Sequence, residues 1–476
     1  MPIFTPSRRW QPAYYPFKKH RLSQRVEESL ERLFKGVLWG CRMCGNCLLQ
    51  ETAFICPMAC PKGIRNGPCG GSTPDHCCVD DSRPCIWYAI FNRAEKMGRL
   101  DLLLEVLPPL DWDKTGISAL GDGTSKIKQH GVLNTMTTVI QSSPRDRKEK
   151  WDKFFTEIRQ PDWWSGDSLP HPAPEREPVS RLETKLKSRA FVITCEVMPP
   201  MTGDSSQLES KLFTLKGLVD AVNITDGASA LTRTSPLNCA LLAKQLNIEP
   251  VLQIAARDRT RISFQADVMG AASLGIRNLL LISGDHPNKG MRPFSKMDVW
   301  DFDSIQAIWM TRKMRDENLL LDGRQINFKP RYFIGAAAAP FASKPAYQAI
   351  RAEKKVNAGA QFLQTNLVFD LNAFETYLEA LDQRNVLSRV HLIAGIAPIR
   401  GIKPLRYLSQ LPGIKIPEMH FRRLESSKNV KEEAHQMNLE LIEKVQSMPG
   451  VRGIHIMAWH NIEDLRRLII DSGLRT

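Results

Sequence analysis

The sequence predicts an α/β protein in which a (β/α)8 TIM barrel is preceded by a small cysteine-rich metal-binding domain. Nine of the eleven cysteines lie between Cys41 and Cys85, and this cluster sets the first part of the chain apart. After residue 186, short apolar runs alternate with amphipathic stretches of helical period, which is typical of βα units and a parallel sheet. Eight such runs follow one another, as a barrel requires: residues 190–197, 219–225, 250–255, 278–283, 332–337, 362–366, 391–396 and 453–457.

A doubly wound sheet is the main structural alternative for the second part. The dinucleotide-binding fingerprint of that fold, GxGxxG at the start of a βα unit, opens none of the eight units. We therefore expect the barrel, with functional residues at the carboxyl ends of its strands.

In chain order the sequence predicts three parts. Residues 1–110 form the cysteine-rich iron–sulfur (or zinc) domain, residues 111–185 connect, and residues 186–476 form the barrel domain. The connection includes a proline-rich tract at residues 160–178, which cannot sustain a helix or a central strand. Residues 145–158, just before that tract, have helical periodicity.

The composition favours a cytoplasmic protein that does not cross a membrane. At 476 residues and 42% apolar content, the chain can bury two or three domain cores. It contains no run of about 18 apolar residues, so no helix is expected to span a bilayer. The basic N-terminal stretch lacks the apolar region of a secretory signal.

The formal net charge of +14 raises the question of nucleic-acid binding. The positive residues are spread along the chain, with the clearest bias in Met1–Gly45, which holds nine Lys or Arg against three Glu. We expect no nucleic-acid partner. A solvated basic surface is the plain interpretation, and steering of an acidic redox protein or an anionic substrate is the functional one.

The cysteine spacing indicates a metal site. The motifs are CRMCGNC, ICPMACPKG and NGPCGG, followed by a Cys-Cys pair and a final cysteine. Thiolates three residues apart can converge on one metal, and proline after cysteine is familiar beside iron–sulfur ligands. Iron–sulfur is favoured, zinc remains open, and a disulfide framework belongs to secreted domains. The expected ligands, enough for two four-ligand sites, are Cys41, Cys44, Cys47, Cys56, Cys60, Cys69, Cys77 and Cys85.

Over residues 40–104 these motifs, together with Cys85-Ile86-Trp87 and the following FNRAEKMGRLDLL, resemble the accessory module of acetogen-type methylenetetrahydrofolate reductases. The resemblance implies an iron–sulfur cluster of the 4Fe-4S type. The family has an acidic residue where this chain has Cys78, and Cys78 is therefore left out of the ligand set.

The second part resembles the barrel of methylenetetrahydrofolate reductases over its full length. Four motifs carry the resemblance: CEVMPP, NITDGA, LISGDHP and EKKVNAGAQFLQTN. It implies a bound FAD, with FMN as an alternative, and a tetrahydrofolate substrate. We also expect a homo-oligomer.

Glu196 is the expected catalytic acid. It ends the first strand between apolar residues and a Pro-Pro turn, so burial should raise the pKa of its carboxyl and let it donate a proton near neutral pH. The alternative is a plain salt bridge across the barrel mouth. The resemblance implies that Glu196 protonates the folate nitrogen and that Asp285, the second catalytic residue, orients the pterin and influences the flavin potential.

Further site residues follow from the resemblance alone. The substrate contacts would be Glu196, Asp285, Asn366 and Arg422. The flavin contacts would be Thr225, Gln253, Gly284, Asp285, Ala337, Ala338, Ala339, Lys354 and Lys355.

The chain also departs from the family pattern. Asn366 and Arg422 stand where the family has glutamines, and Asn461 stands where it has an arginine. Gln253 and Ser343 replace histidines. These departures put direct use of NADH in doubt and favour a redox partner such as ferredoxin or flavodoxin.

The sequence therefore predicts an enzyme of one-carbon metabolism that interconverts 5,10-methylenetetrahydrofolate and 5-methyltetrahydrofolate, with electrons exchanged through the iron–sulfur module or a partner protein. The alternative is a non-catalytic electron-transfer or scaffold subunit with a structural zinc site.

Overall fold

A computed structural model describes residues 22–80, 82–116, 166–287, 300–411 and 413–475 of the chain. The chain forms two compact units. Unit 1 comprises Met1–Pro68 and Pro74–Ser168, and unit 2 comprises Cys69–Thr73 and Leu169–Thr476. The predicted helix at residues 145–158 lies outside the described residues, as does the start of the proline-rich tract. No helix within the described ranges is long and apolar enough to cross a membrane.

Unit 1 has little regular structure, and side-chain amides in it hydrogen-bond to the backbone of distant segments. Asn66 donates to the carbonyl of Leu107 (2.9 Å) and accepts from its N–H (2.7 Å). Asn46 does the same with Asp111, at 3.0 and 2.9 Å. Each side-chain amide thus bonds both the carbonyl and the N–H of one residue, as a residue of a neighbouring strand would. The elements are α1 (Leu22–Trp39), η2 (Pro57–Ala59), α2 (Ile86–Lys96), η3 (Leu100–Leu104) and η4 (Trp112–Lys114).

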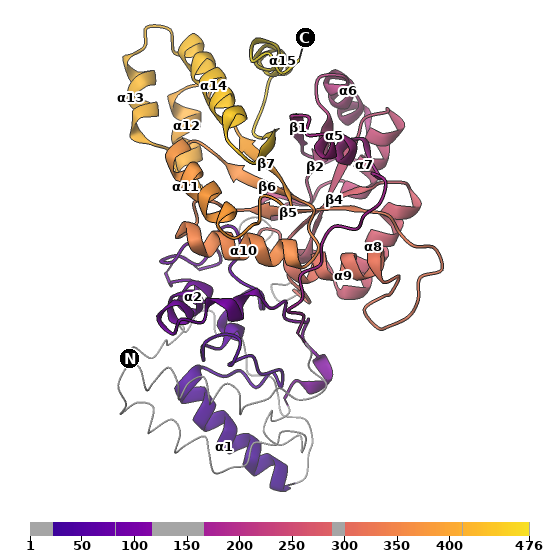
Figure 1. Cartoon of the computed structure of the whole chain (residues 1–476), viewed down its shortest axis with the longest axis vertical. Helices are drawn as coiled ribbons and strands as arrows, with labels where there is room; N and C mark the ends of the chain where they lie inside the picture. The colour runs from indigo at the N-terminus through magenta and orange to yellow at the C-terminus, as the bar shows by residue number, and fades with distance from the viewer. Residues whose placement is uncertain (1–21, 81, 117–165, 288–299, 412, 476) are drawn as a thin grey trace. The chain divides into compact units, whose positions relative to one another are not determined.

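Unit 2 is a closed barrel of eight parallel strands in the order β1 to β8 (Figure 1). Closure comes from β1 pairing with β8, in a register that sets Val192 beside Gly453 and Cys195 beside Ile456. All eight predicted strands are confirmed, with boundaries that move by at most two residues. They are β1 (Val192–Val197), β2 (Ala221–Ile224), β3 (Pro250–Ala255), β4 (Asn278–Ile282), β5 (Phe333–Ala338), β6 (Phe362–Leu367), β7 (His391–Ile396) and β8 (Val451–Ile456).

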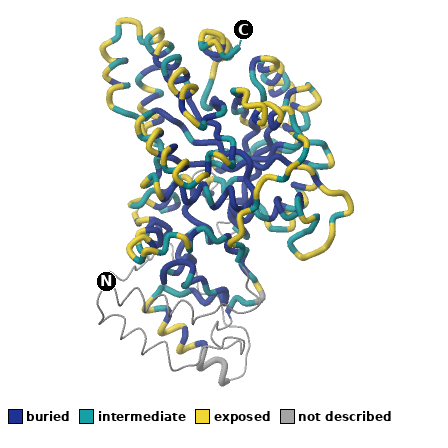
Figure 2. The backbone as a smooth tube through the Cα atoms, viewed as in Figure 1, coloured by how far each residue is buried: buried dark blue, intermediate teal, exposed yellow. Residues whose placement is uncertain are grey.

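Helices surround the strands, which are buried along most of their length, and expose their outer faces (Figure 2). Local signals start them: Asp303 and Gln306 form a capping box on α9, and proline occupies the first turn of α7 and α10. The helices are α5 (Arg181–Lys187), α6 (Ser206–Leu215), η5 (Ala228–Ala230), α7 (Pro236–Gln245), η6 (Ala256–Asp258), α8 (Arg261–Ser273), α9 (Ser304–Asp316), α10 (Pro345–Asn357), α11 (Leu371–Asp382), α12 (Ile402–Ser409), α13 (Glu418–Ser426), α14 (Val430–Ser447) and α15 (Ile462–Asp471).

Helix α5 closes the amino end of the barrel. Its Leu182 and Leu186 are buried and pack in one cluster with residues from seven strands, among them Val192, Phe333 and Phe362. With this end filled, the opposite end of the barrel is left for function, as in other barrels of this kind.

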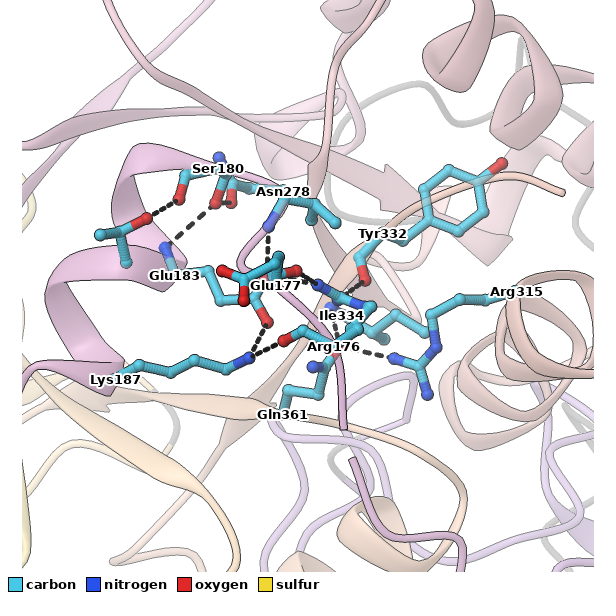
Figure 3. Close-up of polar contacts among 12 residues, drawn as sticks. Arg176, Glu177, Ser180, Glu183, Lys187, Asn278, Arg315, Tyr332, Ile334 and Gln361 are labelled. Atoms are coloured by element: carbon cyan, nitrogen blue, oxygen red, sulfur yellow. Dashed lines mark hydrogen bonds and ion pairs between the residues drawn. The ribbon is translucent and has the colours of Figure 1, made fainter. Parts of the chain in front are cut away.

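A polar network ties the same helix to the strands (Figure 3). Glu183 is fully buried and accepts hydrogen bonds from the Arg176 side chain (2.9 Å) and the Val179 N–H (2.8 Å). Lys187 forms a second ion pair with it at 3.3 Å. Arg176 also donates to the carbonyl of Tyr332, just before β5, at 2.8 Å. The buried Glu183 side chain with these partners fixes the position of α5 at the amino end of the barrel.

We predict that Glu183→Ala lowers the free energy of unfolding of the barrel by about 3 kcal/mol, because it leaves two cations facing a site that has lost its anion. Chemical denaturation followed by circular dichroism measures this. Arg467→Ala is the matched control: its ion pair with Glu432 is exposed on both sides, and surface pairs contribute about 1 kcal/mol or less. Equal effects of the two substitutions would contradict a specific role of the buried network.

Candidate functional site

The carboxyl ends of the strands bring several predicted site residues to one end of the barrel. In β1, β5 and β6 the fifth residue is half-buried while its neighbours along the strand are buried. These three residues are Glu196, Ala337 and Asn366. Thr225 follows β2 directly, and Gly284 and Asp285 follow β4. The half-buried positions mark the mouth of the barrel, opposite α5.

The surroundings of Glu196 favour the protonated form of its carboxyl. Burial raises the pKa of its carboxyl, and the Lys211 ammonium and a hydrogen bond from the Ala458 N–H lower it, with burial winning. Its main-chain carbonyl accepts a hydrogen bond from the Trp459 indole at 2.7 Å. A carboxyl of raised pKa at a barrel mouth can deliver a proton near neutral pH.

Asp285 links two loops at the mouth. Its Oδ2 accepts a hydrogen bond from the Ser229 N–H at 2.9 Å, across from β4 to the loop after β2. Gly284 beside it has φ +80°, and a Cβ there would lie 3.0 Å from the Cβ atoms of both Ala255 and Arg257. The loop after β3 therefore packs against bare backbone, and only glycine fits this position.

Two buried oxygen atoms near the predicted flavin positions have no hydrogen-bond partner among the described residues: Oγ1 of Thr225 and Oδ1 of Asn366. Asn366 uses its amide nitrogen on the Gly413 carbonyl, 2.9 Å away. Buried polar atoms are rarely left unpaired, so these two fit a polar ligand. Small side chains at Ala337–Ala339 leave room at the end of β5.

Lys355 is a buried cation with few partners. Its ammonium donates to the carbonyl of Ala337, and only 7% of the residue is exposed. Burial, together with the charge of Arg351, lowers the pKa of Lys355 to about 7, and Asp303 partly opposes this shift. An anion placed beside this group would restore its charge. The residue therefore fits the phosphate of a cofactor.

The remaining predicted residues lie on three different elements. Gln253 is buried in β3, and Lys354 is buried on α10. Arg422 is exposed on α13. Within the described part of the chain, no hydrogen bond or ion pair joins Arg422 to the residues at the strand ends.

Sequence reasoning missed Lys211 and Trp459. Lys211 lies in the middle of α6, and Trp459 lies in the loop after β8. A lysine in an amphipathic helix and a tryptophan after a strand have no special pattern. The only available signal was that Trp459 follows a strand end, where barrels place functional residues.

Below the mouth the barrel interior is polar. Asn223 of β2 donates to Gln364 of β6 at 2.8 Å, and Thr194 of β1 bonds to Nδ1 of His455 in β8 at 2.8 Å. All four side chains are buried, and burial lowers the pKa of His455 to about 3. These pairs join strands that are distant in the sequence and support the floor of the site.

Four of the predicted metal ligands surround one cavity in unit 1. Cys41, Cys44, Cys47 and Cys56 line it together with Glu31 and Lys35 of α1. Helix α1 leads directly into the segment that begins with Cys41. Gly40 turns the chain with φ +63°, and the Cys41 N–H then hydrogen-bonds to the Lys35 carbonyl at 3.2 Å.

Three of these four sulfurs receive a hydrogen bond from the N–H two residues further along. The donors are Met43 to Cys41 (3.4 Å), Leu49 to Cys47 and Met58 to Cys56. Burial raises the pKa of all three thiols, that of Cys41 to about 12. Backbone donors aimed at sulfur are the usual surroundings of thiolates that bind a metal. The donor set therefore fits a metal or cluster.

The other cysteines are less clearly grouped. Cys77 has a lowered pKa, mainly because the Cys78 thiol hydrogen-bonds to it, and Cys69 contacts the Ser72 hydroxyl at 3.2 Å. None of the eleven cysteines, all of which lie in the described ranges, is part of a disulfide. Across the described ranges, no three His, Cys, Asp or Glu side chains already stand close enough together to hold a metal ion.

Comparison with known proteins finds two family profiles. The profile described as "Methylenetetrahydrofolate reductase" matches residues 181–473, and the one described as "Methylene-tetrahydrofolate reductase C terminal" matches residues 22–113. The second profile covers the segment that contains the cysteine cluster.

Similar individual proteins are distant. A "Probable methylenetetrahydrofolate reductase (NADPH)" of Caenorhabditis elegans is 24% identical over 212 residues, covering 43% of this chain and 29% of that protein. "Methylenetetrahydrofolate reductase 2" of Schizosaccharomyces pombe is 24% identical over 224 residues, covering 43% of this chain and 33% of that protein. The chain thus spans a third or less of the length of these relatives.

Among solved structures, an uncharacterized protein from Clostridium thermocellum, described as binding two copies of 5-methyl-5,6,7,8-tetrahydrofolic acid, is similar at a TM-score of 0.46 and 17% identity. The match covers 62% of this chain and 100% of that one.

Proposed function

The chain belongs to the methylenetetrahydrofolate reductase family, and on that premise we propose that it interconverts 5,10-methylenetetrahydrofolate and 5-methyltetrahydrofolate on a bound flavin. The observation that carries the proposal is Glu196: a carboxyl at the barrel mouth whose pKa is raised by burial. Reduction of a ring-closed folate needs a proton at the nitrogen that leaves the one-carbon unit, and a protonated carboxyl in that place supplies it.

The residues that would hold the flavin are those with unused polar capacity at the strand ends. Thr225 offers a buried hydroxyl that has no hydrogen-bond partner among the described residues. Lys355 offers a buried amine suited to a phosphate. Ala337–Ala339 would admit a flat ring. When bound, a flavin supplies the hydride that reduces the one-carbon unit, and the protein's share is binding, orientation and electrostatics. FAD is the cofactor we propose, with FMN as the alternative.

Asp285 and Asn366 would orient the folate. One oxygen of the Asp285 side chain accepts from the Ser229 N–H, and the other would accept from a pterin amine. Asn366 has a buried carbonyl oxygen without a partner in the described part of the chain. We keep Arg422 as a proposed folate contact that depends on the position of α13 when substrate is bound.

For unit 1 we propose a 4Fe-4S cluster on Cys41, Cys44, Cys47 and Cys56. The shared cavity and the N–H donors to three of the sulfurs support it. Zinc on the same thiolates is the alternative. The remaining predicted ligands stay proposals: Cys60, Cys77 and Cys85 belong to unit 1, and Cys69 belongs to unit 2.

We further propose that electrons arrive from a protein such as ferredoxin or flavodoxin through this module. The basic bias of Met1–Gly45 suits an acidic partner. One-electron delivery to a flavin gives the cluster a purpose that direct hydride transfer from NADH would not.

We predict that Glu196→Gln binds flavin and folate but turns over about a hundredfold more slowly or worse, because the amide keeps the shape and loses the proton. Anaerobic turnover, flavin absorbance and folate calorimetry measure the three properties. Glu463→Gln, an exposed substitution on α15, should leave all three unchanged. Near-normal turnover of Glu196→Gln would mean that another group supplies the proton.

Cys44→Ser should lower the iron content of the purified protein and leave the flavin content of the barrel unchanged, because the two sites lie in separate compact units. Metal analysis and absorbance spectra check this. Cys239→Ser is the control, since Cys239 is a buried thiol of α7 in the barrel. Zinc in place of iron in unaltered protein would favour the scaffold alternative, and unchanged metal in Cys44→Ser would remove Cys44 from the ligand set.

The electron donor can be identified by following flavin bleaching anaerobically with NADH, NADPH or reduced ferredoxin. We expect ferredoxin to react fastest and to slow as salt rises, because screening shortens the reach of charge. Bleaching by a nicotinamide alone at the rate of turnover, unaffected by Cys44→Ser, would defeat the proposal of a protein donor.

A further inference from the structure

The loop after β8 is built around Glu196. The Trp459 indole donates to the Glu196 carbonyl at 2.7 Å, and the Ala458 N–H hydrogen-bonds to the Glu196 side chain. Ala458 has φ +54°, a left-handed conformation that is unfavourable for a residue with a Cβ. The two hydrogen bonds to Glu196 help to hold this strained turn, which points Trp459 across the end of β1.

Lys211 of α6 reaches the same place from the other side. Its ammonium lies 4.3 Å from the centroid of the Trp459 ring, a cation–π contact. The lysine is half-buried, so the ring holds its charge near the barrel mouth and away from bulk water. The indole N–H of Trp459 thus bonds the main chain of Glu196, and the face of its ring contacts the Lys211 ammonium.

We propose that Lys211, held over Trp459, is a positioning residue that adjusts proton donation by Glu196. The inference rests on the proposed function, because it assumes that Glu196 is the acid of that reaction. Lys211 itself need not touch the substrate. Its charge acts on the carboxyl, and Trp459 sets the distance over which it acts.

The electrostatics around the carboxyl fit this role. Burial raises the pKa of Glu196, and the Lys211 ammonium is the principal group that opposes this shift. Burial lowers the pKa of Lys211, and Cys195 and then Glu196 oppose that shift. The other titratable group acting on this pair, within the described residues, is Cys195 of β1, a buried thiol of raised pKa. The loop after β8 contributes only the backbone of Ala458 and the neutral ring of Trp459.

A cation beside the acid has a mechanistic use. A carboxyl buried without one would hold its proton too tightly to transfer it efficiently, because a general acid works best when its pKa lies near the working pH. The lysine also stabilises the carboxylate that remains after the proton has left. The simpler alternative is that Lys211 only covers the ring of Trp459.

The test reads Glu196 directly. The infrared band of a protonated carboxyl is assigned by its absence in Glu196→Gln and then followed against pH in the full chain. Lys211→Met removes the charge and keeps the stem, and should move the titration upward by about one pH unit or more. Lys211→Arg keeps the charge and should stay near the unaltered protein. Trp459→Leu frees the lysine into solvent and should shift the titration upward by less than Lys211→Met.

Lys216→Met, at the exposed end of the same helix, is the matched control and should not move the band. An unchanged titration in Lys211→Met, or an equal shift in Lys211→Arg, would overturn the proposal. In active protein the alkaline limb of the kcat profile should move upward with the band, since the acid form then persists to higher pH. The infrared titration does not need turnover, so absence of folate reduction in unaltered protein would count against the proposed function alone.

Discussion

The pairing of β1 with β8 is the constraint on which the site depends. Once the first and last strands share a register, with Thr194 beside His455 and Cys195 beside Ile456, residues about 260 positions apart become neighbours. Glu196 then lies against the loop that carries Ala458 and Trp459. An open sheet would leave both edges unpaired and would separate the acid from the loop that holds it. Closure therefore creates the site as well as the fold.

Much of the barrel could be predicted because its signal is local. Each strand is a short apolar run between turn signals, and the eight runs recur at the spacing of βα units. The position of Glu196 at a strand end followed from the same pattern, and the raised pKa of its carboxyl followed from the apolar residues and prolines around it. The irregular unit 1 was different. The side-chain amides of Asn66 and Asn46 hydrogen-bond to backbone groups 41 and 65 positions away. No periodicity in the sequence indicates such a single hydrogen-bonded amide.

The site residues divide along the same line. Gly284 and Asp285 were recognisable because they form one contiguous motif after a strand. Lys211 and Trp459 were not, because their meaning lies in a contact between α6 and the loop after β8, with 247 residues between the two by position number. A lysine in a helix is ordinarily solvated, and only the fold places this one over an indole ring. Residues that form one contiguous motif can be recognised in the sequence, whereas residues that meet only when the barrel closes are found from the structure.

One physical cause produces two opposite shifts at the mouth of the barrel. Burial raises the pKa of Glu196, an acid that is neutral when protonated, and lowers the pKa of Lys355, a base that is neutral when deprotonated. In both cases the dry surroundings disfavour charge until a partner of opposite sign arrives. Lys211 is that partner for Glu196 within the chain. Among the described groups that act on Lys355, Arg351 also lowers its pKa, and Asp303 only partly offsets the effect of burial. Within the described residues a cation thus acts on the acid, whereas Asp303 does not offset the burial of Lys355. This asymmetry supports the proposal that an external anion, such as a cofactor phosphate, binds at Lys355.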